Sequence, residues 1–441
     1  MNKQEWIRRA LEKGMDGFEI YQGVSSSRSM TWFQGKRQAF TVSKIISTSV
    51  KALIKGKSAA MSLERVDDDK MDEILDQLIQ QANVISDSEK DILTERMETE
   101  ETPSLKNWVR PSVEEITEFL SSLEEKLKAA DPRITQVNEV EWSDGEGSRE
   151  VVNSRGVEAK DSSANQLVAA FITMVQDGIV RDGTRIELVE NIADFDQDAF
   201  VAKLVEEVSS SLGAKSMKSK TIPVILRNDV MSTLLDCFAG LFYGDMIAKG
   251  ISPLTGKEGQ QIMSENITII DDPRSQDALE LNNYDDEGHP TYTKAVVEKG
   301  VFETVLHNNK SALKMNTEST GNGFRSGGGA TDVSATNLYI VPDQEDLEGL
   351  EKTMKDGIVI TSLAGMHAGI DFVTTNFSLQ AKGYLVKDGK KDRPVTLITI
   401  AGNFLDLMNH VHAVGSDLDW SYRSVAAPSV LFDGIAVSGK E

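Results

Sequence analysis

The sequence contains a single cysteine, Cys237, among its 441 residues. One cysteine cannot form an internal disulfide, and it excludes any Cys-x-x-Cys metal site. Histidine is scarce as well, with five residues in the whole chain. No run approaches the length of about 18 uninterrupted apolar residues that a membrane-spanning helix needs. We therefore expect no internal disulfide, no Cys-x-x-Cys metal site and no membrane-spanning helix.

Positive charge is in short supply too. Lys and Arg number 47 against 70 Asp and Glu, which gives a formal net charge of −23 at pH 7. Binding to nucleic acid needs a basic surface that meets the phosphates, so the composition argues against such a partner. The N-terminus, Met1–Trp6, is charged and amphipathic and has no apolar signal core. We therefore expect a cytoplasmic protein that contacts neither membrane nor nucleic acid.

The remaining composition is that of an ordinary globular protein, with 39% hydrophobic residues. Its length predicts two or three domains. Strand-like and helical segments alternate in strand-rich blocks, which favours an α+β fold over a regular parallel sheet. The stretch GAKSMKSK at 213–220 is the best candidate linker. We expect an N-terminal α+β domain at 1–213 and a strand-rich C-terminal domain at 221–441, composed of a central segment 221–272 and a C-terminal segment 282–441.

Apolar periodicity places the individual elements. Helices are predicted at 3–13, 71–84, 112–131, 200–212, 345–355 and 403–412, and the third begins with a capping box at Ser112. Strands are predicted in the first half at 17–22, 37–41, 47–54, 134–142 and 167–176. In the second half they are predicted at 292–298, 338–341, 358–362, 378–386, 395–401 and 430–437. The acidic stretch 88–103 lacks periodicity and is predicted to be a surface loop.

The central segment, 221–272, is the most informative stretch. Ile222–Leu226 is typical of a short buried strand, and the polar break at 227–229 offers side-chain oxygens that can cap a helix start. From Val230 to Met246 the apolar residues follow helical spacing, which predicts one helix with a buried face. A glycine-rich loop then leads to a strand at 266–270.

Short motifs follow one another in a fixed order through this segment and beyond it. They are Gly244-Asp245, Lys249-Gly250, Gly256–Gly259, Asp286–Gly288, Ser319–Asn322, Ala364–Gly369, Asn376–Ala381, Ile400–Phe404 and Gly415–Leu418. In this order and spacing the chain resembles the TldD/PmbA family, whose members were once called modulators of DNA gyrase. The resemblance runs over most of the chain and implies the fold of a metallopeptidase family.

The resemblance also implies where a metal site would lie. The TldD branch carries a His-Glu-x-x-x-His motif before Gly-Asp, and its positions fall here on Leu235, Asp236 and Gly240. Leucine and glycine cannot ligate zinc, which takes nitrogen, sulfur or oxygen donors. The cysteine of the TldD branch has no counterpart in residues 420–428. We therefore expect neither a metal ligand nor a catalytic residue in this chain, with zinc carried by a TldD-type partner.

A rearranged metal site would have to use Asp236, Cys237 and His367. A cysteine on a core helix is more typical of a small buried apolar residue than of a ligand. His410 and His412 are two residues apart, so they lie on different helix faces and make poor co-ligands. Such a site remains open as an alternative.

A groove for peptides is the second site that the resemblance implies. Residues 321–329 do not fit a phosphate loop, because neither Gly-Lys-Ser/Thr nor a helix follows the glycines. In the family, this region and the segment around His367 line the groove beside the metal centre. Glycines and an arginine suit an extended peptide, held by backbone hydrogen bonds or by its carboxylate. The candidate residues are Gly321, Asn322, Arg325, His367 and Asn376.

The resemblance, together with the missing metal ligands, implies a non-catalytic TldE/PmbA-type subunit of a TldD–TldE zinc metalloprotease assembly. Its substrates would be unfolded or small peptides, in proteolysis or peptide maturation. One alternative is a peptide-binding homodimer that acts as a scaffold without a catalytic partner. The other is an active metallopeptidase with rearranged ligands.

Overall fold

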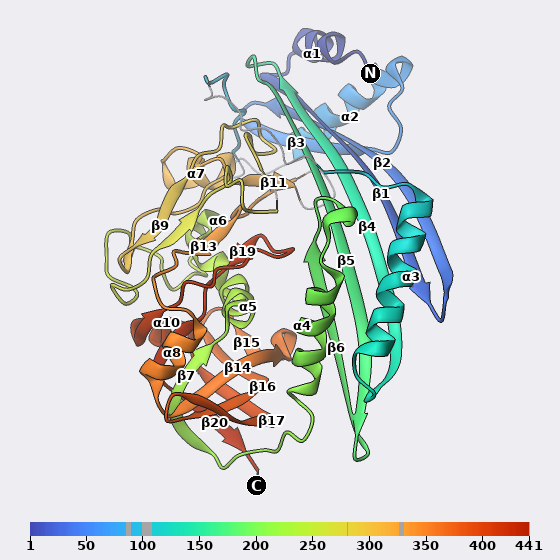
Figure 1. The fold of residues 1–441 in the computed structure, drawn as a ribbon. Coiled ribbons are helices and arrows are strands. Elements are labelled where there is room, and N and C mark those ends of the chain that lie inside the picture. Colours follow the sequence, from blue (N-terminus) through green and yellow to red (C-terminus); the bar gives the residue numbers. More distant parts are fainter. Residues whose placement is uncertain (85–89, 99–107, 280, 326–329, 441) are drawn as a thin grey trace.

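The computed structural model describes residues 1–84, 90–98, 108–279, 281–325 and 330–440. Four sheets and their helices form two halves that lie against each other (Figure 1). The α-helices are α1 Lys3–Glu12, α2 Met71–Val84, α3 Val113–Ala130, α4 Gln197–Ser209, α5 Asn228–Phe238, α6 Gly244–Ala248, α7 Asn309–Met315, α8 Leu347–Met354, α9 Met366–Gly369 and α10 Phe404–Asn409. The fold is α+β, as the sequence predicts.

The strands divide between the two halves. The N-terminal half contains β1 Gly17–Phe33, β2 Lys36–Ile54, β3 Lys57–Leu63, β4 Ile134–Asn153, β5 Glu158–Gln176 and β6 Ile179–Leu188. The C-terminal half contains β7 Lys220–Leu226, β8 Ile269–Asp271, β9 Lys294–Glu298, β10 Val301–Phe302, β11 Gly323–Arg325, β12 Thr331–Val333, β13 Leu338–Ile340, β14 Gly357–Ala364, β15 Ile370–Asp371, β16 Asn376–Lys387, β17 Lys390–Asn403, β18 Val411–Val414, β19 Val425–Ala426 and β20 Val430–Gly439.

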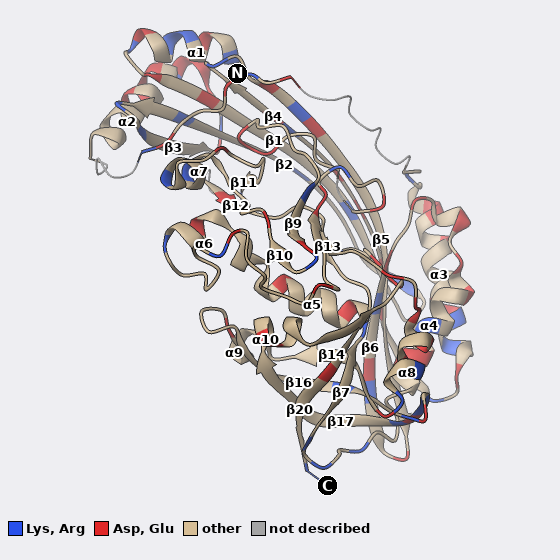
Figure 2. Cartoon of the chain, turned by 90° about the vertical axis from the view of Figure 1, so that its left-hand side faces the viewer, with Lys and Arg blue, Asp and Glu red and all other residues tan. Residues whose placement is uncertain are grey.

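The N-terminal half is built on one antiparallel sheet in the order β3-β2-β1-β4-β5-β6. Four of its strands have between 17 and 20 residues, and together they form the long curved sheet in Figure 2. The short separate strands predicted at 17–22, 37–41, 134–142 and 167–176 are therefore parts of much longer ones. The prediction was too short because serine and glycine interrupt the apolar alternation, whereas the backbone ladder continues through them.

All four helices of this half cover the same face of the sheet. Helices α1 and α2 pack on Phe18 and Ile20 near one end, and α3 and α4 pack on Met30 and Trp142 near the other. Phe18, Ile20 and Met30 are even-numbered residues of β1, and alternate residues of a strand share a face. The opposite face is left to the C-terminal half and to solvent.

The predicted helices of the N-terminal half are confirmed to within three residues at each end. Helix α3 begins with the expected capping box, in which Ser112 Oγ accepts from the Glu115 backbone N–H at 3.2 Å. Glu115 Oε2 in turn accepts from the Ser112 backbone N–H at 2.8 Å. The box satisfies two donors that the first helical turn leaves unpaired.

The C-terminal half centres on the strands β14-β7-β20-β17-β16, which a β14–β16 pairing closes into a ring. Strands β7 and β14 are parallel, and the other pairs of the ring are antiparallel. The largest hydrophobic cluster joins these strands to α5 and α10, and α8 covers a smaller cluster around Ile225 and Val359. The strand-rich character predicted for this half is confirmed.

The central helix differs from its prediction. Instead of one helix from Val230 to Met246, α5 ends at Phe238, a 3-10 turn spans Ala239–Phe242, and α6 follows. The Gly244 backbone N–H donates to the Leu306 carbonyl at 2.7 Å instead of continuing the helical ladder. The polar break at 227–229 does offer side-chain oxygens to the helix start, because Asn228 Oδ1 accepts from the Asp229 backbone N–H at 2.7 Å and Asp229 Oδ1 from the Val230 backbone N–H at 2.9 Å, although the N-cap position itself is occupied by Arg227.

Three further regions complete the comparison with the sequence. The candidate linker 213–220 packs on the C-terminal half, where Lys215 bridges to Val395 and Met217 is buried. The predicted loop 88–103 lies partly outside the described residues, and its described part contains the buried Leu93. In the part of the chain that the structure describes, no helix is long and apolar enough to cross a membrane.

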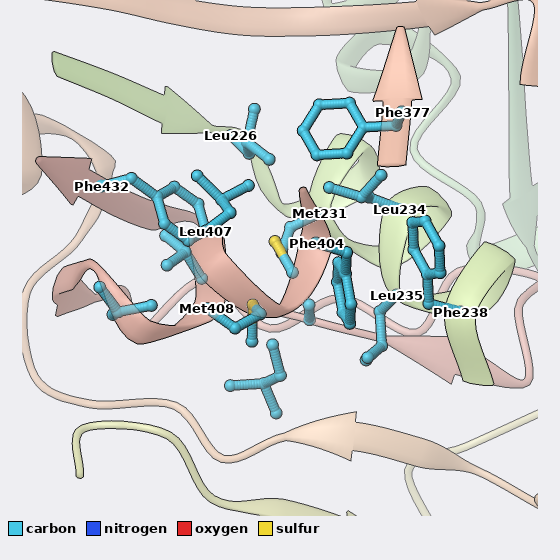
Figure 3. Close-up of a cluster of buried hydrophobic side chains, with 14 of the residues drawn as sticks. Leu226, Met231, Leu234, Leu235, Phe238, Phe377, Phe404, Leu407, Met408 and Phe432 are labelled. Atoms are coloured by element: carbon cyan, nitrogen blue, oxygen red, sulfur yellow. The ribbon is translucent and has the colours of Figure 1, made fainter. Parts of the chain in front are cut away.

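Replacing Phe404 by alanine is expected to destabilise the C-terminal half by roughly 3–5 kcal/mol, because a large cavity opens in the core. Phe404 is fully buried, and its ring stacks on Phe238 with centroids 4.5 Å apart (Figure 3). Urea unfolding measures the shift in midpoint. The control is Val373→Ala, at a side chain that is 58% exposed, which should change the midpoint little. Equal shifts for the two variants would contradict the assigned core.

Candidate functional site

The three positions where the metal motif would fall point in different directions. Leu235 is fully buried in the core, next to Phe238 and Phe404 in Figure 3. Gly240 lies in the 3-10 turn, and a Cβ there would be 3.1 Å from the ring of Phe372. Asp236 alone is exposed. Of the three motif positions, only Asp236 on α5 therefore exposes a group that could ligate a metal, and that group is a single carboxylate.

Asp236 has a cationic neighbour. Partial desolvation raises the pKa of Asp236, and the positive charge of Arg423 opposes this shift. Arg423 Nη1 donates to Thr233 Oγ1 at 2.9 Å, one turn before Asp236 on α5. A single carboxylate near an arginine provides by itself neither a metal site nor a nucleophile.

The other residues considered for a rearranged site do not assemble into one. Cys237 is half-buried against the core, and burial together with the charge of Asp236 raises the pKa of its thiol. A raised pKa disfavours the thiolate, which is the form that binds metal. His367 is exposed on α9. Among the described residues, no three His, Cys, Asp or Glu side chains are grouped so that they could hold a metal ion.

The five residues of the predicted peptide groove fall into two separate groups. Gly321 and Asn322 precede β11 in the C-terminal half, where Asn322 is fully buried and donates to Asp271 Oδ2 at 2.8 Å, and Arg325 at the end of β11 reaches Glu19 of β1. His367 and Asn376 are exposed, close to the short β15–β16 pairing. The structure therefore does not bring the five together, and the remaining residues of the glycine loop, 326–329, lie outside the described residues.

Arg325 is part of a buried network of charges between the halves. Its Nη2 donates to Glu19 Oε1 at 2.9 Å, and its guanidinium lies 4.7 Å from the centroid of the Tyr21 ring. Burial raises the pKa of Glu19, while Lys51 and Arg325 act in the opposite direction. Lys51 itself pairs with Asp91 at 2.8 Å. Arg325 thus fastens β11 onto β1 of the long sheet.

The acidic turn Asp285–Glu287 continues this network. Asp285 accepts three backbone N–H groups, including that of Gly323 at 2.9 Å, and burial raises its pKa. Glu287 accepts the Asn309 backbone N–H and the Thr331 hydroxyl, each at 2.7 Å. In the sequence, Asp286 and Glu287 are marked only by their place in the Asp286–Gly288 motif, and Asp285 is not marked at all. Their abundance of backbone partners makes them structural.

His307 lies in the core. It is 3% exposed, and its Nδ1 lies 3.0 Å from Ser311 Oγ. A Cβ at Gly244 would come within 2.1 Å of the same ring nitrogen, so glycine is required at 244. Burial lowers the pKa of His307 to about 4, which keeps the imidazole neutral at pH 7.

Two cavities border the contact between the halves. One, of about 260 Å³, is lined by Arg325, Lys51 and residues of α6 and α7. The other, of about 250 Å³, lies on the helix-free face of the long sheet beside Asn282. No sequence motif marks this second cavity, because its serines and glycines lie far apart in the chain.

Comparison with known proteins places these features in a family. A model described as the PmbA/TldA metallopeptidase C-terminal domain matches residues 219–439, and one described as the central domain matches residues 106–212. The first match alone spans half of the chain. The chain belongs to the PmbA/TldD family of metallopeptidases.

Curated relatives carry the same family names. The metalloprotease PmbA homolog of Haemophilus influenzae is 27% identical over 331 residues, which are 74% of this chain and 70% of that protein. The metalloprotease PmbA of Escherichia coli O157:H7 is 25% identical, over 75% of this chain and 71% of that protein. The family membership expected from the motifs is confirmed.

Solved structures show the same fold. A protein described as a putative modulator of a DNA gyrase, from Thermotoga maritima, matches with a TM-score of 0.88 and 29% identity, covering 99% of both chains. TldE from Thermococcus kodakarensis matches with a TM-score of 0.90 over 99% of this chain and 100% of its own, and at 22% identity it shows the fold alone.

Acidification should destabilise the protein through His307. Its pKa of about 4 in the folded chain lies below the ordinary value of 6.5, so the unfolded chain binds the proton more readily. The stability is complete above about pH 6.5 and declines as the pH falls towards about 4, by about 2 kcal/mol at about pH 5. We expect His307→Gln to lack this part of the decline, as measured by urea unfolding at about pH 7.5 and about pH 5.

The matched control for this measurement is His410→Gln, at an exposed histidine. It should lose as much stability on acidification as the unaltered protein does. An identical decline in His307→Gln would show that the buried imidazole does not contribute.

Proposed function

We propose that this chain is the TldE/PmbA-type subunit of a two-subunit metalloprotease and that it holds no catalytic metal of its own. One observation carries the proposal: the motif positions are occupied by Leu235 in the core, Asp236 at the surface and Gly240 against Phe372. A catalytic zinc site needs about three protein ligands and an activated water, together with a carboxylate that takes the proton. Asp236 could supply only the last of these.

Zinc would then be carried by a TldD-type partner. This chain would complete a shared cavity that admits unfolded or small peptides and excludes folded proteins. The support for such a partner is that the family has two branches, and that both PmbA and TldD homologs are found among the curated relatives. Proteolysis and peptide maturation are both compatible with this role.

The substitution of Leu235 for a ligand also has a structural benefit. A histidine at this position would place a polar ring among Phe238, Phe404 and Met231, where an unsatisfied polar group is costly. Leucine instead contributes apolar contacts to the core. In a subunit that binds no metal, helix α5 can therefore contribute apolar side chains to the core at this position.

Zinc content is the first test. We expect the chain, purified without a metal-affinity column, loaded with zinc and dialysed, to retain less than about 0.1 ion per chain, since it has no ligand set. Plasma mass spectrometry counts the bound ions. About one tightly held ion per chain would overturn the proposal and favour rearranged ligands.

Peptide hydrolysis is the second test. The chain alone should not cleave an unfolded protein such as reduced casein, whereas a mixture with the TldD-type subunit of the same organism should do so. In that mixture, Cys237→Ser, His367→Ala and Asp236→Asn should each keep the rate within about twofold, because none of them binds the metal. A hundredfold loss in any of them would support rearranged ligands instead.

The same mixture decides between a catalytic assembly and a scaffold. Size-exclusion chromatography with light scattering should show a complex of the two subunits. A homodimer that neither binds nor activates the TldD-type subunit would favour the peptide-binding scaffold.

A further inference from the structure

The outer edge of the long sheet is unpaired over much of strand β2. On one side β2 pairs with β1 along its whole length, up to the hairpin turn at 34–35. On the other side β3 pairs only with residues 48–54. Among the described residues, no strand or isolated bridge pairs with the outer edge of residues 37–47. Figure 1 shows the β1–β2 hairpin at the margin of the molecule.

This free edge also carries exposed apolar side chains. Val42, Ile45 and Ile46 are 66%, 61% and 56% exposed. Val42 and Ile46 share one face of the strand and Ile45 lies on the other, because successive side chains of a strand point to opposite faces. An edge strand presents a row of unpaired N–H and C=O groups, and a long apolar edge is a template for pairing with another chain. Main-chain donors and acceptors and apolar contacts are therefore offered at the same place.

Two copies of this edge fit each other in an antiparallel pairing with two-fold symmetry. In such an interface, if residue i of one copy contacts residue j of the other, residue j also contacts residue i. When Val42 lies opposite Val42 of the second copy, Arg37 lies opposite Ser47. Residues 37 and 47 are the two ends of the unpaired stretch. This register therefore uses the whole free edge of both copies.

The charges favour the same register. Lys44 is the only charged residue inside the stretch 38–47, and in this register it lies opposite Phe40 of the second copy. An ammonium group is attracted to the face of an aromatic ring. On the other face of the strand, Ile45 lies opposite Ala39. A pairing centred on Lys44 would instead place two ammonium groups directly opposite each other, which is destabilising.

We propose that the free edge of β2, residues 37–47, is the docking surface for a second copy of this chain, paired antiparallel about Val42. The two long sheets then form one continuous sheet, with helices α1 to α4 of both copies on the same side. The interface uses no residue of the metal-motif helix α5, so the inference is independent of the proposed function.

Light scattering on the full chain by itself is the first test. We expect a dimer, and Val42→Lys should raise its dissociation constant at least about tenfold, because two like charges then face each other. The matched control is Val180→Lys, at a valine that is 53% exposed on β6, the opposite edge strand of the same sheet. This control should leave the dissociation constant unchanged. Urea unfolding verifies that both variants are folded.

Disulfide crosslinking tests the register. In a Cys237→Ser background, Val42→Cys should form a covalent dimer on oxidation with copper phenanthroline, because opposite Cβ atoms in a sheet lie about 4.5–5.5 Å apart. Lys44→Cys on the same face is the matched control. In the proposed register its two copies lie about 13 Å apart along the strand, which is too far for a disulfide. Gel electrophoresis without reductant measures the covalent dimer.

Several outcomes would overturn the proposal. These are a chain that remains monomeric at about 100 μM, a dimer that Val42→Lys does not weaken, and equal crosslinking of Val42→Cys and Lys44→Cys. A chain that is monomeric alone, but loses its complex with the TldD-type subunit through Val42→Lys, would assign the edge to that subunit instead. None of these results changes the zinc content or the hydrolysis expected of the proposed function, so the two failures are distinguishable.

Discussion

The arrangement of the two halves depends on pairing the charges that are buried between them. Arg325 reaches Glu19, Arg149 reaches Asp286, and Asp161 accepts the backbone N–H groups of residues 283 and 284 at 2.9 Å. Unpaired charges in such a place would be strongly destabilising, so each pair holds its segment at one position on the sheet. The segment 281–325 is thereby fixed across β1, β4 and β5.

This constraint determines which residues remain available to a ligand. Asn322 and Arg325 would suit a peptide groove by their chemistry, but Asn322 donates to Asp271 within the C-terminal half and Arg325 is engaged in holding the halves together. The same contacts bring Asn282 to the edge of the sheet, where its Oδ1 accepts from Arg149 Nη2. The polar chemistry of these residues is therefore used within the chain itself.

The long sheet has two different faces for the same reason. One face is covered by α1 to α4 over large apolar residues such as Trp142 and Met30. The other meets polar segments of the C-terminal half, and serine and glycine are tolerated there because no hydrophobic layer has to be filled. The long sheet therefore has one apolar face covered by helices and one polar face that meets the C-terminal half (Figure 2).

The sequence by itself determined several of the helices and the family to which the chain belongs. Helices α1, α2 and α3 can be predicted from their apolar spacing, and α3 also from the capping box at Ser112, because these signals depend on residues that are close in sequence. The order of the motifs identifies the family. The absence of metal ligands at Leu235 and Gly240 also follows directly from residue chemistry.

Only the tertiary structure decided the length of the strands, the break between α5 and α6, and the burial of Asn322 and Arg325. Strand length depends on pairing with distant residues, and so Ser25 and Gly147 continue a ladder without any apolar pattern. The helix break depends on Leu306 and His307, which lie some 60 residues further along the chain. Periodicity reports which face of an element is apolar. It carries no information about which distant segment covers that face, and that segment decides whether a polar residue binds a ligand or its own chain.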